Sequence, residues 1–149
     1  MLFRSRLVSV ELAIPPVDRV LMARVLAGGI ARLAARTGRD FDDVLPLFDP
    51  DSPDGSPLLD LCETPRDTKR AVNALAAALP LVPADADLGD AALDIVLRLH
   101  VPVLDSPRLD WRTRVRDTTR AQLLAELDAA IVGHRLAGPA RAALRALFH

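Results

Sequence analysis

Residues 64–75 read TPRDTKRAVNAL, a stretch that combines a helix start with a basic face and an apolar face. The hydroxyl of Thr64 can cap the first turn, and Pro65 suits the first helical position, where a missing N–H costs nothing. Asp67 falls in the same turn, where the helix dipole favours an acid. The apolar side chains recur with helical spacing, as Ala71, Val72, Leu75, Ala76 and Leu79. We therefore expect a helix from Thr64 to about Leu79 that buries this face.

The opposite side of this helix is basic, because Arg66, Lys69 and Arg70 lie together there with Asn73. Arg66 breaks a local rule, since a cation in the first turn opposes the helix dipole. A residue that breaks a local rule is often retained for a site rather than for the fold. Helix N-termini also attract anions, so the arginine predicts a contact with phosphate. The pattern leaves open the alternative that this is the solvated face of an ordinary core helix.

The composition limits the classes of protein to consider. The 149 residues are enough for one domain with its own core, and half of them are hydrophobic. A net charge of -1 gives no reason to expect binding to nucleic acid or to anionic membranes, and a 3% aromatic content argues against a stacking surface for single strands. No apolar run reaches the ~18 residues that a membrane-spanning helix needs. A single cysteine excludes an internal disulfide, so we expect a cytoplasmic protein.

No complete catalytic or metal site is recognisable in the sequence. The only lysine, Lys69, lacks the glycines of a phosphate-binding loop. The three histidines are dispersed, and the acids of residues 49–57 have no fixed ligand spacing, so we expect no metal centre. Cys62 is either a nucleophile or a small buried side chain beside Leu61, and we favour burial. We assign no catalytic residue.

The rest of the chain predicts further helices. Apolar periodicity and breaker residues place them at residues 17–36, 40–48, 90–99, 118–134 and 140–147. The pair Gly28–Gly29 lies inside the first of them and predicts a kink or a close contact between helices. In the helix over 90–99, which we expect to be central, Asp94 can pair with Arg98 four residues later.

Residues 7–14, LVSVELAI, predict a short strand that ends at two prolines. We expect a single all-α domain over residues 1–149, in which residues 1–16 form a strand-like lead-in and residues 17–149 a helical region. Its architecture would be an irregular bundle of about five to six helices with, at most, one N-terminal strand.

A resemblance to a known family rests on residues 63–79, ETPRDTKRAVNALAAAL. This run resembles the C-terminal helical part of KAP-family P-loop NTPases, where a helix that begins Thr/Asn-Pro-Arg-x-x-Lys-Arg and continues to an Asn follows the nucleotide-binding core. Residues 8–17, VSVELAIPPV, are similar to the last core strand and the proline-rich step after it. Residues 90–103, DAALDIVLRLHVPV, look like the next apolar helix of the family. The matching motif residues are Thr64, Pro65, Arg66, Lys69, Arg70 and Asn73.

The resemblance implies that the chain is the lid of an NTPase. Arg66 would act like the sensor arginine of related ATPases and reach the terminal phosphates of a nucleotide, with Arg70 and Lys69 as secondary candidates on the same face. The family couples ATP or GTP hydrolysis to membrane-associated or antiphage roles. ATP and Mg²⁺ are expected in an intact family member, and a separate P-loop core would be the partner. Because this sequence lacks the P-loop and the magnesium-binding acid, we expect no catalysis by this chain alone.

Two other functions stay open. The chain can be a stand-alone helical module for protein–protein interaction, with a partner surface at residues 108–116 or on the last helix, where we expect Leu144, Leu147 and Phe148 to be exposed. Residues 107–117 carry four arginines around Trp111 and could bind nucleic acid, but three neighbouring aspartates offset that charge. A lid should present an apolar surface to its core, whereas an independent module should close its own core.

Overall fold

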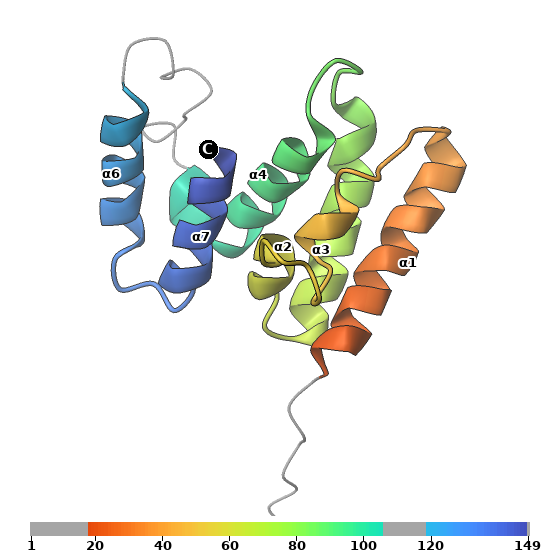
Figure 1. The fold of residues 1–149 in the computed structure, drawn as a ribbon, viewed down its shortest axis with the longest axis horizontal. Helices are drawn as coiled ribbons and strands as arrows, with labels where there is room; N and C mark the ends of the chain where they lie inside the picture. The colour runs from red at the N-terminus through yellow and green to blue at the C-terminus, as the bar shows by residue number, and fades with distance from the viewer. Residues whose placement is uncertain (1–17, 106–118, 149) are drawn as a thin grey trace, which may run out of the picture.

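The chain folds as a bundle of helices (Figure 1). A computed structural model describes residues 18–105 and 119–148. The prediction of an all-α bundle of about five to six helices is confirmed in these ranges, which contain no strand. The strand predicted over 7–14 and the arginine-rich residues 107–117 lie outside the described residues. The α-helices are α1 (Arg19–Thr37), α2 (Pro57–Asp60), α3 (Pro65–Ala78), α4 (Leu88–His100), α6 (Arg120–Ile131) and α7 (Ala137–Leu147), and the 3-10 helices are η1 (Leu45–Leu47), η2 (Leu79–Leu81) and η3 (Pro102–Asp105).

Helix α3 begins as its sequence predicts. The Thr64 hydroxyl accepts a hydrogen bond from the Asp67 backbone N–H at 3.1 Å, and the Asp67 carboxylate accepts one from the Thr64 N–H at 3.1 Å. This reciprocal pair fixes where the helix starts. The expected apolar face turns inward, with Ala71, Leu75 and Leu79 fully buried, while the basic face is exposed.

Helices α1 and α3 run side by side in the same direction (Figure 1). They approach closely at Gly29, where a Cβ atom would lie only 2.6 Å from Cγ1 of Val72. The close contact between helices predicted at Gly28–Gly29 is therefore present, and it requires glycine at the second position only. The start of α1 is also tied to the end of α2, because Arg19 forms a 2.6 Å ion pair with Asp60.

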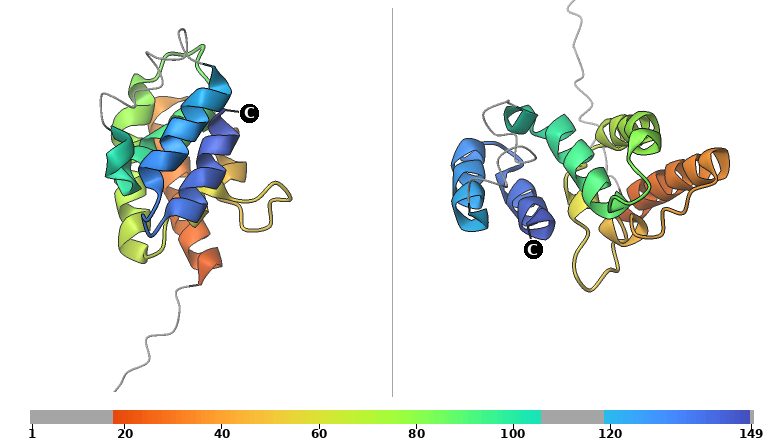
Figure 2. Two further views of the ribbon diagram at one scale, coloured as in Figure 1. Left: turned by 90° about the vertical axis from the view of Figure 1, so that its left-hand side faces the viewer. Right: turned by 90° about the horizontal axis from the view of Figure 1, so that it is seen from above.

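Helix α4 is central, as expected for the helix over residues 90–99. It packs against α2, α3, α7 and η3. Seen from above, α1 and α6 lie at opposite ends of the bundle with α4 between them (Figure 2, right). The expected pair between Asp94 and Arg98 forms at 2.8 Å. The buried apolar side chains form one cluster to which every α-helix of the described part contributes.

Two of the expected helices differ most from the structure. The helix predicted over 40–48 is reduced to turns and the 3-10 helix η1, in which Pro46 has no N–H to donate to an α-helical ladder. The last helix begins at Ala137 rather than Ala140, so Gly138 and Pro139 lie in its first turn instead of separating two segments. Proline is tolerated there because the first N–H groups of a helix have no partner within the helix.

The Gly29–Val72 contact predicts opposite effects for two adjacent substitutions. Gly29→Ala should lower the free energy of unfolding by about 1–3 kcal/mol, because the new methyl group overpacks the α1–α3 contact. Gly28→Ala should leave stability unchanged or raise it by up to about 1 kcal/mol, since its Cβ meets only the flexible Arg32 side chain at 3.7 Å. Urea unfolding followed by circular dichroism measures both. The double variant with Val72→Ala should recover part of the loss, and equal effects at both glycines would contradict the packing.

Candidate functional site

The structure brings the three predicted phosphate-contact residues together. Arg66, Lys69 and Arg70 are all exposed on the outer face of the first two turns of α3. None of them makes a hydrogen bond or an ion pair with another residue of ranges 18–105 and 119–148. Three adjacent cations without a carboxylate partner in these ranges repel one another, so an anion would be favoured at this face.

The helix end itself contributes less to anion binding than its sequence predicts. The Asp67 carboxylate accepts hydrogen bonds from the backbone N–H groups of Thr64 at 3.1 Å and Glu63 at 3.3 Å. The Asp67 N–H is in turn taken by the Thr64 hydroxyl. These donors are no longer available to a ligand, and the Asp67 carboxylate offsets part of the helix dipole. A phosphate at this position would therefore be held mainly by the side chains of Arg66, Lys69 and Arg70.

A cluster of buried polar side chains lies behind the start of α3. Cys62 Sγ is 4.0 Å from His100 Nε2, and the Asp67 and Thr68 side chains are buried nearby. Burial raises the pKa of the Cys62 thiol to about 12, and the Asp67 carboxylate adds to this effect. Burial also lowers the pKa of His100, and the charges of Arg70 and Arg135 lower it further against the opposite effect of Asp67. These shifts disfavour a thiolate–imidazolium pair, so the cluster is unsuited to nucleophilic catalysis.

One cation near this site could not be predicted from the local sequence. Arg135, in the turn before α7, forms a 2.9 Å ion pair with Glu63, which is 72 residues away in the chain. Its positive charge acts on His100 together with that of Arg70. The segment before α7 is therefore joined to the residue that precedes the cap of α3, and Glu63 offsets the charge of Arg135. No periodicity or motif could have placed Arg135 there, because only the packing of α7 does so.

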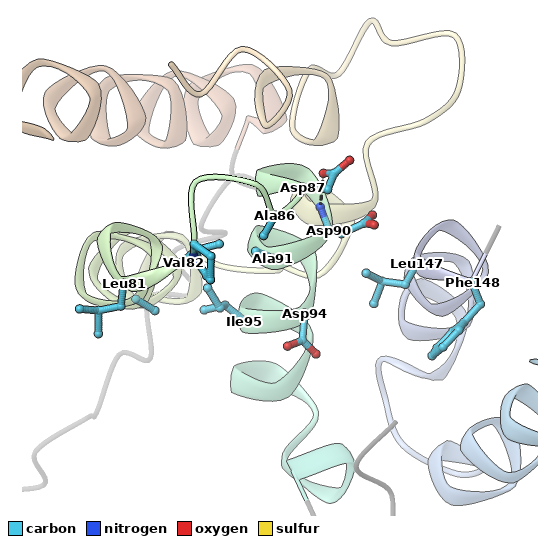
Figure 3. A pocket seen from close by; sticks show the side chains of 12 residues that line it. Leu81, Val82, Ala86, Asp87, Asp90, Ala91, Asp94, Ile95, Leu147 and Phe148 are labelled. Atoms are coloured by element: carbon cyan, nitrogen blue, oxygen red, sulfur yellow. Dashed lines mark hydrogen bonds between the residues drawn. The ribbon is translucent and has the colours of Figure 1, made fainter. Parts of the chain in front are cut away.

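A second surface feature is a groove of about 610 Å³ that is lined by α4, α7 and the η2 region. We call it the α4–α7 groove. Its floor is Ala91 and Ile95, with walls formed by Leu81 and Val82 on one side and Leu147 and Phe148 on the other (Figure 3). Leu144, which we expected to be exposed with Leu147 and Phe148, is fully buried, and the other two are half-buried. The prediction was wrong because α7 packs on α2, α4 and α6 and so buries more than one face.

The described residues offer neither a metal centre nor a membrane span. Within the described ranges, no group of three or more His, Cys, Asp or Glu side chains is arranged to hold a metal ion. The described helices are also too short or too polar to cross a lipid bilayer. Neither observation identifies a reaction.

Comparisons with models of protein families, with curated proteins and with solved structures found no match to this chain. A function for this chain is therefore inferred from its own residues and geometry, together with the motif of residues 63–79.

The buried state of Cys62 predicts low reactivity. A thiol with a pKa of about 12 instead of 9.0 holds about a thousandth of the thiolate at pH 8. Native protein should therefore react with a disulfide reagent such as Ellman's reagent at least about a thousandfold more slowly than urea-unfolded protein. A Cys62→Ala variant that carries the exposed Ala129→Cys provides a folded control and should react rapidly. Fast labelling of native Cys62 would contradict the burial.

The buried imidazole predicts a dependence of stability on pH. The pKa of His100 is lower in the folded state than its ordinary value of 6.5, so the unfolded chain takes up a proton that the folded chain refuses. Stability from this residue is full above the ordinary pKa and is lost as the pH falls towards the folded pKa, with a slope of at most about 1.4 kcal/mol per pH unit. Urea unfolding of wild type and His100→Gln from pH 8 to pH 5 isolates this effect by difference. Parallel profiles would contradict it.

Proposed function

We propose that this chain is the C-terminal lid of a KAP-like P-loop NTPase and that Arg66 contacts the phosphates of a nucleotide held by the P-loop core. The observation that carries the proposal is the set of three exposed cations at the start of α3, which have no carboxylate partner among the described residues. The chain has 20 acidic and 19 basic residues. Carboxylates would therefore be available to pair with these three cations if the face served only the fold. The cations match the Arg and Lys-Arg positions of the family motif.

An apolar surface at the same end of the bundle supports this proposal. Val20, Leu21 and Val25, in the first two turns of α1, are 44%, 55% and 44% exposed. Helices α1 and α3 begin at the same end (Figure 1), and the Arg19–Asp60 ion pair joins α1 to the segment just before α3. In the family, the nucleotide core precedes this segment. A lid is expected to present apolar side chains where that core packs, next to the residue that senses the nucleotide.

The physical role of Arg66 follows from its charge and position. A charge-assisted hydrogen bond between an arginine and a phosphate contributes about 1.5–3 kcal/mol. If that contact forms only when the lid is closed, the nucleotide shifts the enzyme towards the closed state by the same amount. Lys69 and Arg70, one turn further along α3, would add attraction to the same phosphates, the lysine as a less directional point charge. ATP and Mg²⁺ would bind to the core, which would also carry the catalytic residues.

The alternative function is a stand-alone interaction module with no nucleotide role. The hydrophobic cluster favours it, because every described α-helix contributes buried side chains to one core without a second protein. The two proposals are distinguished by the reading frame that precedes the codon of Met1. An open frame that encodes Gly-x-x-x-x-Gly-Lys-Ser/Thr and a magnesium-binding acid would support the lid. A stop codon directly upstream would favour the module.

The lid proposal predicts the effect of one substitution in the protein that joins this chain to its P-loop core. Arg66→Ala should lower kcat for ATP hydrolysis about tenfold to a hundredfold, as expected for the loss of one charge-assisted contact. The melting temperature should not change, because Arg66 is exposed and has no partner in the described part of the chain. Arg145→Ala, in the last turn of α7, is the matched control and should hydrolyse ATP normally. Unchanged hydrolysis by Arg66→Ala would remove the sensor role.

A further inference from the structure

The α4–α7 groove is built by helices that pack on α4 from two sides. α3, continued by η2, lies along one side of α4, and α7 lies along the other. Arg39 holds the η2 wall in place, because its guanidinium donates hydrogen bonds to the carbonyl oxygens of Val82 at 2.8 Å and Leu79 at 3.3 Å. The wall is therefore preformed by a side chain that does not line the groove. At about 610 Å³, the groove falls within the size range of ligand sites.

The groove combines an apolar interior with a negative rim. Every charged residue that lines it is an aspartate: Asp87, Asp90 and Asp94. Asp94 is buried and paired with Arg98 at 2.8 Å, and Asp87 caps α4 by accepting a hydrogen bond from the Asp90 N–H at 2.9 Å. The Asp90 carboxylate, exposed at the rim, has no hydrogen bond or ion pair with any described residue. Partial burial and the charge of Asp87 raise its pKa, which is consistent with a position that favours a positive charge.

The most exposed apolar side chain of this region stands at the edge of the groove. Leu81 in η2 is 83% exposed, although it is large and fully apolar. Its burial by a partner would be favourable in proportion to the apolar area removed from water. Leu81 therefore extends the apolar lining outward from the floor at Ala91 and Ile95.

We propose that the α4–α7 groove binds a short amphipathic helix of a partner protein. The partner helix would insert apolar side chains between the two walls and place a lysine or arginine beside Asp90. A helix laid against a groove between other helices is a common mode of peptide recognition, and the aspartate rim selects a basic flank over an acidic one. The binding site is separate from the basic face of α3, because α3 has 14 residues and its two ends lie about 20 Å apart.

The test uses a synthetic probe helix and its charge-reversed counterpart. The probe has about 14 residues, or four turns, with Leu on one face and Lys on the other. In the counterpart every Lys is replaced by Glu. Titration of the isotope-labelled chain, followed by NMR, should show saturable shifts in the methyl signals of Val82, Ile95 and Leu147 with the Lys peptide only. The affinity should fall as salt is added, because the contact with Asp90 is screened.

Two variants and a control locate the binding. Asp90→Lys should weaken binding of the Lys peptide about tenfold or more, since an attraction becomes a repulsion. Ala86→Trp places a large side chain at the exposed rim and should also weaken it. Asp54→Lys, an equal charge reversal in the exposed loop before α2, should bind as the wild type does. Circular dichroism confirms that each variant is folded.

Several outcomes would overturn the proposal. These are equal binding of the two peptides, signal shifts confined to the exposed face of α1, or an affinity that Asp90→Lys leaves unchanged. A dimer seen by sedimentation velocity and abolished by Asp90→Lys would show that a second copy of this chain fills the groove instead. Arg66→Ala should bind the peptide normally whether or not it affects ATP hydrolysis, so failure of this proposal and failure of the lid proposal are distinguishable.

Discussion

The capping pair of Thr64 and Asp67 is the constraint on which the candidate basic face of α3 depends. It sets the first residue of α3 and thereby the rotation of every side chain along the helix. With that rotation, Ala71 and Leu75 face the core and Arg66 faces solvent. The same pair occupies backbone N–H groups that would otherwise attract an anion, so an anion at this helix end would be held mainly by the arginine and lysine side chains.

Local sequence was sufficient to predict the parts of the fold that depend on short-range physics. The start of α3, the central position of α4 and the Asp94–Arg98 pair all follow from spacing within one helix. The same reasoning misplaced the start of α7, because Gly138 and Pro139 read as a break although proline is permitted in a first helical turn. It also placed Leu144 at the surface, since sequence spacing does not reveal that α7 packs on three neighbouring helices, α2, α4 and α6.

The candidate sites were predictable only where one helix supplies them. Arg66, Lys69 and Arg70 share a face of α3, so helical periodicity finds them together. Other contacts join distant parts of the chain. Arg135 lies beside Glu63, 72 positions away, and His100 lies beside Cys62, 38 positions away. The α4–α7 groove likewise depends on the separation of two walls that belong to different helices. Such features are set by tertiary packing, for which a single sequence carries no local signal.

The close contact between α1 and α3 bears on how a lid would transmit information. Val20 and Leu21 lie at the end of α1 that is next to the start of α3 (Figure 1). Further along, α1 approaches α3 closely at Gly29, because glycine has no side chain to hold the helices apart. A second link is the hydrogen bond from Arg36 to the Ala76 carbonyl at 3.4 Å. Because packed interiors deform little, the two helices should move as one body. Under the lid proposal, docking of the apolar end of α1 against a core would therefore also set the position of Arg66, and closure would be a rigid-body motion rather than a rearrangement within the bundle.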